Sequence, residues 1–336
     1  MKSVKMNYLL LVCLSIFYTC CKKEKIIETK ALQLTGSIAL PNVVGRIDHF
    51  DFDAKNQILF LAELGNNTVE FIDLKNKIVL HRIGNLSNPQ GVLFIPQTNT
   101  LVISNAGNAE CGFYNAQTFQ KITSFNLASD ADNMRYDAVS KLIYIGYGDG
   151  AMAIIDAITF KIVGDVKLSG HPESFQIDKS SNKIYVNVPD NHQIEVVDLT
   201  AKSVTDIWKV TTAKSNYPMS LDEENHRLFV GCRSPAKLLI LDTKTGKTIS
   251  SFDIDSDVDD VYYDNKNKQI YLSCGGGYVN VFNQKDADTY IYDGKIASKT
   301  GARTSFLLSE IRQLIVASPS AIGREASLLI YDIKKQ

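Results

Sequence analysis

A strand–turn–strand pattern that recurs seven times is the feature that most constrains this chain. At 182–199 an alternating run, IYVNV, is followed by turn residues, PDNH, and by a second β-rich run that ends in Asp or Asn, QIEVVDL. The first strands of the seven copies are anchored at Leu59, Leu101, Ile143, Ile184, Leu228, Ile270 and Leu314, in steps of 42, 42, 41, 44, 42 and 44 residues. The closing residues are Asp73, Asn115, Asp156, Asp198, Asp242, Asn283 and Asp332. A period of about 40–45 residues in a strand-only chain is typical of a β-propeller with one four-stranded blade per repeat. The sequence therefore predicts an all-β, seven-bladed β-propeller.

The two ends of the chain are expected to share one blade. The seventh repeat stops at Gln336, just after its third strand, whereas the stretch 32–40, LQLTGSIAL, has no partner strands nearby in sequence. If this N-terminal strand completes the last blade, the ring closes and two exposed sheet edges disappear. We therefore place the propeller at residues 32–336.

The first residues are predicted to direct export. Lys2 and Lys5 precede an apolar stretch, YLLLVCLSIFY, that is too short to span a membrane comfortably, and Cys20 and Cys21 follow it. Residues 1–20 resemble a lipoprotein-type signal peptide, with Cys20 (or Cys21) as the lipidated residue and 21–31 as a polar tether. An ordinary signal peptide with incidental cysteines is the alternative. The lipoprotein interpretation predicts a membrane-anchored protein of the cell envelope, outside the cytoplasm, and several acyl chains would hold it durably at the bilayer.

Candidate site residues emerge when the innermost strands are aligned on the Asp that usually ends them. In a propeller these strands line the central channel, and the loops that lead into them form its mouth. The polar residues four, five or seven positions before that Asp, with the matching part of the seventh blade, include Arg46, Asp48, His49, Asp132, Asn133, His171, Glu173, Asp259 and Arg303. We predict that these nine residues form a ligand-binding channel mouth, to which Asp130, Asp257 and Asp260 also belong.

Carboxylates that arrive from several blades cannot all stay ionised side by side without positive charge between them. Arginines and histidines could supply that charge, or a bound cation could. We predict a divalent cation such as Ca²⁺, held by Asp48, Asp132, Glu173 and Asp259, because Ca²⁺ takes six to eight oxygen ligands. The structural alternative is that such Asp and Asn residues only cap turns in a wet channel.

Other chemistry is excluded or unsupported. The net charge of −1 gives no basic face for nucleic acid. The sequence contains no GxSxG, no CxxCH and no phosphate-binding loop. Cys111, Cys232 and Cys274 lie inside the ring and are expected to be buried thiols.

Several segments resemble the YVTN-type, YncE-like family of bacterial propellers from about Thr35 to the end. They include RIDHFDFD at 46–53, NPQGV at 88–92, DADNMRYD at 130–137, GHPESFQ at 170–176, NVPDNHQIEVVD at 187–198 and GARTS at 301–305. The resemblance implies an exported seven-bladed propeller of a family labelled lactonase-like or quinoprotein-like by fold. It assigns no catalytic residue.

Two function classes follow from these features. The first is a lipid-anchored module that binds an unknown small molecule or protein through its acidic channel mouth. The second is a lactonase-like hydrolase in which a divalent cation in the channel polarises a carbonyl and a carboxylate or His49 acts as base.

Overall fold

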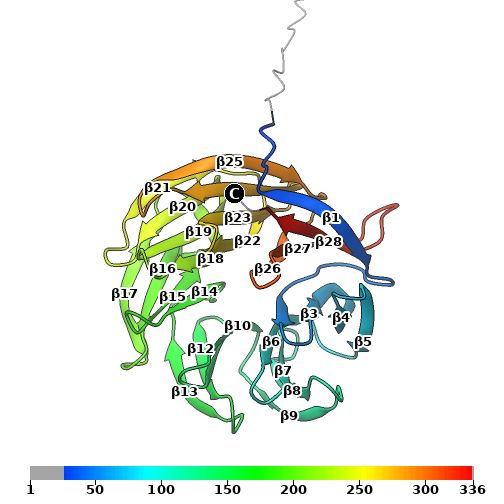
Figure 1. Ribbon diagram of the computed structural model, residues 1–336. Coiled ribbons are helices and arrows are strands. Elements are labelled where there is room, and N and C mark those ends of the chain that lie inside the picture. The colour runs from blue at the N-terminus through cyan, green and yellow to red at the C-terminus, as the bar shows by residue number, and fades with distance from the viewer. Residues whose placement is uncertain (1–25, 335–336) are drawn as a thin grey trace, which may run out of the picture.

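A computed structural model describes residues 26–334 as a closed ring of seven four-stranded antiparallel sheets arranged around a common centre (Figure 1). The predicted seven-bladed β-propeller is confirmed. Each sheet is one blade, and its strands run in sequence order from the centre outward in the first six blades. From the alignment of the inner strands we expect the first and fourth to span 46–53 and 173–178. They begin later, at Phe50 and Phe175, because irregular backbone hydrogen bonds such as that from Asp48 N–H to Ala62 O replace the regular ladder there.

Each of the first four blades has an inner strand at the channel and a more exposed strand at the outer edge of the ring. Their strands are β2 (Phe50–Asp53), β3 (Ile58–Glu63), β4 (Thr68–Asp73), β5 (Ile78–Ile83); β6 (Pro89–Ile95), β7 (Thr100–Asn105), β8 (Glu110–Asn115), β9 (Lys121–Asn126); β10 (Ala131–Asp137), β11 (Leu142–Tyr147), β12 (Ala151–Asp156), β13 (Ile162–Lys167); and β14 (Phe175–Asp178), β15 (Lys183–Val188), β16 (Gln193–Asp198), β17 (Ser203–Lys209).

The remaining three blades follow the same plan. Their strands are β18 (Lys214–Asp222), β19 (Arg227–Ser234), β20 (Ala236–Asp242), β21 (Thr248–Asp253); β22 (Val258–Asp264), β23 (Gln269–Cys274), β24 (Tyr278–Gln284), β25 (Tyr290–Ala297); and β26 (Thr304–Leu308), β27 (Gln313–Ser318), β28 (Ser327–Ile333) with β1 (Leu32–Ala39). Two one-turn 3₁₀ helices, Leu64–Asn66 and Pro189–Asn191, complete the regular structure of the described residues.

The hydrophobic core lies between neighbouring blades rather than at the centre of the ring. One cluster, for example, joins Leu93 and Phe113 of the second blade to Met134 and Ile143 of the third. Second and third strands are buried on both faces and read as nearly continuous apolar runs. Because the apolar residues are used between blades, the inner strands are free to carry polar side chains into the channel.

The repeated Asp residues at strand ends have a structural role. Asp53 Oδ1 accepts the backbone N–H groups of Lys55 and Asn56. Asp198 Oδ1, at the end of a third strand, accepts those of Thr200 and Ala201 in the same way. These strand-ending carboxylates therefore cap turns, as expected if such Asp residues have a purely structural role.

The ring is closed by the N-terminal strand, as predicted. β1 pairs antiparallel with β28, from Leu32 opposite Ile333 to Ala39 opposite Ser327, and Figure 1 shows the blue strand lying beside the red one. Ile38 of β1 is buried in a cluster that also contains residues of the last and the first blade, so this strand joins the two. Closure removes the open edges that an incomplete blade would leave.

The segment before β1 is attached to the outside of the sixth blade. Thr29 N–H donates to Lys295 O at 3.2 Å, and Lys295 N–H donates to Ile27 O at 2.9 Å. Thr29 and Ala31 are buried. The predicted signal peptide, Cys20 and Cys21 lie outside the described residues.

Cys111, Cys232 and Cys274 are buried free thiols, as expected. Burial raises the pKa of the Cys111 and Cys232 thiols to about 12, so neither is a reactive thiolate at neutral pH. Within 26–334, no helix is long and apolar enough to cross a membrane.

Candidate functional site

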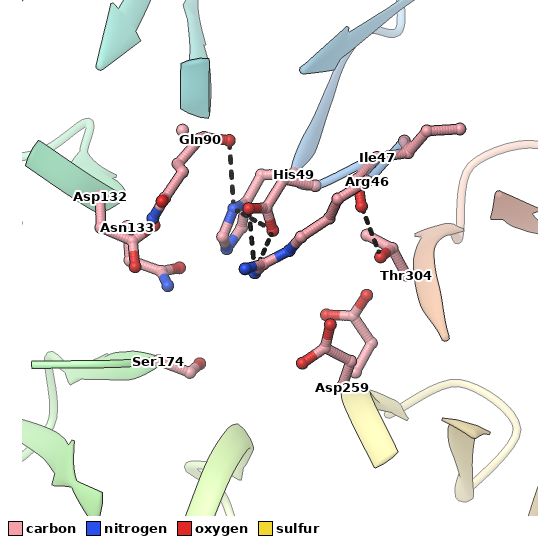
Figure 2. A network of polar contacts seen from close by, with 12 residues as sticks. Arg46, Ile47, His49, Gln90, Asp132, Asn133, Ser174, Asp259 and Thr304 are labelled. Atoms are coloured by element: carbon pink, nitrogen blue, oxygen red, sulfur yellow. Dashed lines mark hydrogen bonds and ion pairs between the residues drawn. The ribbon is translucent and has the colours of Figure 1, made fainter. Parts of the chain in front are cut away.

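A cavity of about 290 Å³ occupies the centre of the ring, and all seven blades contribute to its wall. Two of the nine predicted site residues do not line the cavity themselves but contact residues that do: His171 contacts Asp132, and Arg303 contacts Asp259. Figure 2 shows side chains from several blades directed toward this common centre. The other seven predicted residues line the cavity: Arg46, Asp48, His49, Asp132, Asn133, Glu173 and Asp259.

The channel wall has two levels because side chains alternate along a strand. On β10, Asn133 and Arg135 line the cavity; Met134 between them also reaches its wall but is 4% exposed and packs in the core between the second and third blades. The positions two residues before the end of each inner strand therefore form a lower ring beneath the mouth. Its seven members all line the cavity: Asp51, Leu93, Arg135, Gln176, Ser220, Tyr262 and Phe306.

The first blade supplies a compact ionic group at the mouth. Arg46 Nη2 lies 3.0 Å from Asp48 Oδ2, and His49 Nδ1 lies 3.3 Å from Asp48 Oδ1 and 3.2 Å from Gln90 O. Asp48 is only 3% exposed. Burial raises the pKa of its carboxyl, and the charges of His49 and Arg46 oppose that rise.

The third and fourth blades meet through His171. Its Nδ1 lies 2.7 Å from Gly148 O, and its Nε2 lies 3.8 Å from Asp132 Oδ2. The Asp132 carboxylate raises the pKa of His171 to about 9, against the effect of burial. Burial disfavours the ionised form of Asp132, but His171 and the charge of His49 together hold the pKa of that carboxyl below its usual range. The pair is therefore an ion pair at neutral pH.

Asp259 is held by arginines from the two blades on either side. Arg233 Nη2 donates to its Oδ1, and Arg303 Nε lies 3.0 Å from its Oδ2. Arg233 also stacks over Tyr217, 4.2 Å from the ring centre, and Arg303 Nη1 donates to Asp257 at 2.8 Å. Two basic side chains thus neutralise the Asp259 carboxylate.

Glu173 differs from these three carboxylates. Its backbone N–H donates to Asn187 O, but within residues 26–334 its side chain has no hydrogen bond and no ion pair. Burial, followed by repulsion from Asp132, raises the pKa of Glu173 to about 8. A cation arriving in the channel would therefore favour the ionised form of Glu173.

Two further oxygens in the mouth lack hydrogen-bond donors. Asp132 Oδ1 and Asp48 Oδ2 are buried without a hydrogen-bond partner among the described residues, although Arg46 is in ion-pair range of the latter. Buried acceptors without donors are costly. Both oxygens are therefore desolvated without a compensating donor in the described part of the chain.

The residues seven positions before the strand-ending Asp, at the edge of the mouth, have a structural role in the backbone. Asp130, Ser215 and Asp257 have φ values of 37°, 58° and 61°, in the left-handed region that Asp tolerates better than most residues. Asp130 O and Asp257 O accept the N–H groups of Gly148 and Gly275. Neither Asp130 nor Asp257 lines the cavity.

The arrangement does not fit the predicted calcium ion. Among residues 26–334, no three His, Cys, Asp or Glu side chains are grouped so that they could hold a metal. Asp48, Asp132 and Asp259 each face a basic side chain instead. A calcium site needs six to eight oxygens around one point, and the mouth carboxylates do not converge in that way.

Sequence reasoning missed the lower ring and Arg233. The period of two along a strand would have found the lower ring, because residues two positions after Asn133 or Asp260 face the same way. Arg233 lies near the far end of β19, which runs longer than its counterparts, and no repeat position marks it.

Comparisons with known proteins show the fold alone. No protein-family model and no curated protein sequence matches the chain. Among solved structures, a chain of a structure described as "Crystal Structure of Mitotic Checkpoint Complex" is similar over 100% of both chains, with a TM-score of 0.72 and 12% identity. A chain of hydrazine synthase from Kuenenia stuttgartiensis matches over 87% of this chain and 98% of its own, with a TM-score of 0.71 and 14% identity. The protein is thus similar in architecture to these solved chains, and its membership of the YVTN-type family stays a prediction.

Proposed function

We propose that this protein is a binding module whose central channel takes a small ligand bearing an ammonium group, with Glu173 as the main acceptor. The observation that carries the proposal is the Glu173 carboxyl, which lines the cavity and has no hydrogen-bond or ion-pair partner in the described part of the chain, although the charge of His171 acts on it. Asp48, Asp132 and Asp259 already face basic side chains, and the Asp260 carboxyl accepts a backbone N–H group.

The charge balance of the cavity supports a cation. Two arginines, Arg46 and Arg135, line it together with six carboxyl groups, those of Asp48, Asp51, Asp132, Glu173, Asp259 and Asp260. The pKa values of Asp48, Asp51, Glu173 and Asp260 are raised, chiefly by burial. A positive ligand would lower the free energy of their ionised forms.

Ligand binding should therefore be linked to proton release. Glu173, with a pKa of about 8, is mostly protonated at pH 6.5 in the free channel. An ammonium group favours the carboxylate, so binding expels the proton and becomes tighter as pH rises toward 8. An alkylammonium keeps its charge over this range, as a lysine side chain does.

Butylamine is a suitable probe, measured by calorimetry at pH 6.5 and 8 in buffers of different ionisation enthalpy. Binding should tighten with pH and release close to one proton at pH 6.5. Glu173→Gln should weaken binding by about tenfold or more, since a hydrogen bond to a charged group contributes about 1.5–3 kcal/mol, and it should abolish the release.

Asp130→Asn is the matched control. It removes one carboxylate from the same mouth, but Asp130 does not line the cavity. If both variants weaken butylamine binding equally, bulk charge and not the Glu173 contact explains the affinity. Absence of binding by the wild type rejects the proposal.

We also propose that the module is anchored to a membrane of the cell envelope through a lipidated Cys20. The support is the sequence of residues 1–21, which resembles a lipoprotein signal. Cys20→Ser should abolish acyl labelling and release the protein from the membrane fraction, whereas Cys21→Ser should not. Labelling that depends on Cys21 moves the cut site by one residue, and labelling on neither rejects the anchor.

A lactonase-like hydrolase is the alternative function that we propose. The observation that favours it is again Glu173, because a carboxyl with a pKa near 8 suits a general base. Turnover of a lactone that Glu173→Gln abolishes would support it. Butylamine binding without lactone turnover supports the binding module alone.

A further inference from the structure

Arg135 is a channel residue that the proposed ammonium site does not use. It belongs to the lower ring, and its guanidinium lies 5.4 Å from the centre of the Phe175 ring. Nη1 donates to Met134 O at 2.7 Å and to Asn133 Oδ1 at 3.3 Å, and Nη2 approaches Ser174 Oγ at 3.5 Å. An arginine has five N–H donors in a planar fork. Nε has no hydrogen-bond partner among residues 26–334, so the fork is only partly used.

No carboxylate in the described chain lies within ion-pair distance of Arg135. Two acidic groups near it, Asp51 of the lower ring and Asp260 of the mouth, are engaged by the backbone instead. Asp51 accepts the N–H groups of Phe94 at 2.5 Å and Phe52 at 2.7 Å, and Asp260 accepts that of Ser305 at 2.6 Å. Burial raises the pKa of Asp51 to about 6 and that of Asp260 well above its usual range. The positive charge of Arg135 is therefore incompletely offset.

We propose that Arg135 binds an anionic group of the same ligand, so that the channel takes a small zwitterion with its ammonium at Glu173 and its carboxylate at Arg135. The inference rests on the proposed function, because it adds a second charged contact to that site. We call the Glu173 contact and the Arg135 contact the two poles of the site. Guanidinium forks suit carboxylates, which can accept two parallel N–H bonds.

The two poles lie on adjacent parts of one wall. Glu173 precedes Ser174, whose hydroxyl is the Nη2 neighbour of Arg135, and all three line the cavity. Leu93 and Phe306 of the lower ring supply apolar surface for a short hydrocarbon spacer. A cation at the mouth and an anion below it would each lie beside a protein group of opposite charge.

A series of ω-amino acids tests the inference, because it varies the separation of the two charges. The probes are glycine, β-alanine, 4-aminobutyrate and 6-aminohexanoate, each compared by calorimetry with the amine and the carboxylate of equal chain length. For at least one length, the zwitterion should bind at least tenfold more tightly than its amine. Arg135→Met should remove that gain and leave the amine's affinity within about threefold.

Arg312→Met is the matched control, since Arg312 donates to Ile333 O and does not line the cavity. Thermal melts check that Arg135→Met is folded, and Arg135→Lys, which keeps the charge, should retain part of the gain. If no zwitterion exceeds its amine, or if Arg135→Met weakens both equally, the second pole is rejected while the ammonium site stands. If only carboxylate-bearing probes bind and need Arg135, the ammonium proposal fails and the Arg135 pole stands. If no probe binds, both are rejected.

Discussion

Arg303 and Asp259 join the seventh blade to the sixth at the channel mouth, with Nε of the arginine 3.0 Å from Oδ2 of the carboxylate. Arg233 of the fifth blade reaches the other oxygen of the same carboxylate. Asp259 thus connects three consecutive blades, and none of the three side chains is more than 27% exposed.

Arg303→Met should destabilise the ring by about 1–2 kcal/mol, because it leaves Asp257 and Asp259 with less positive charge in a partly buried site. Lys237→Met is the control: its partner Asp253 has a side chain 88% exposed, and exposed pairs contribute about 0–1 kcal/mol. Urea unfolding measures both. Equal losses would show that the mouth pair has no special role in stability.

The His171–Asp132 pair predicts a defined pH dependence. The pKa of His171 is raised to about 9 in the folded protein. The pair therefore contributes its full stability below about pH 6.5, the unfolded value, and loses it as pH rises through about 9. His171→Gln should be less stable than the wild type at pH 6, with the difference shrinking by pH 9.5. A difference that stays constant with pH would contradict the ion pair.

A buried carboxyl pair in the first blade predicts that a substitution increases stability at high pH, in contrast to His171→Gln. Thr68 Oγ1 donates to Glu63, Arg82 Nε donates to Glu70 at 2.9 Å, and both glutamates are fully buried. Burial, and then repulsion from Glu70, raises the pKa of Glu63 to about 8. A raised carboxyl pKa means that the wild type loses stability as pH rises from about 4.5 to about 8.

Glu63→Gln removes that loss and keeps an acceptor for Thr68. The free energy of unfolding of the variant, relative to that of the wild type, should increase with rising pH, and the variant should be the more stable protein above pH 8. Melting temperatures at pH 5 and pH 8.5 test this. A variant whose deficit is the same at both values would show that Glu63 does not change its ionisation between them.

Ring closure can be tested on one strand with a buried and an exposed position. Ile38 is 2% exposed and packs between the last and the first blade, whereas Leu34 of the same strand is 48% exposed. Ile38→Ala should cost about 2–5 kcal/mol, and Leu34→Ala should stay within about 0.5 kcal/mol. Similar small effects at both positions would mean that β1 is not held in the last blade.

The ring is predictable from the sequence because the repeat is regular in both length and turn chemistry. The same regularity brings Asp48, Asp132, Glu173 and Asp259 to one mouth, since each stands at the same distance before a strand-ending residue. The pairing of those groups is a different matter. Whether Arg233 reaches Asp259, or His171 reaches Asp132, depends on strand length and on side-chain conformations, which the repeat does not encode.

The most direct test of the account is the protonation of Glu173 in the channel. Carboxyl carbon NMR on glutamate-labelled protein, assigned with Glu173→Gln and Glu63→Gln, gives its pKa with and without saturating butylamine. The account predicts a value near 8 in the free protein and a clear fall with the amine bound. A free value near the ordinary one of about 4.3, or one that butylamine does not change, would contradict it.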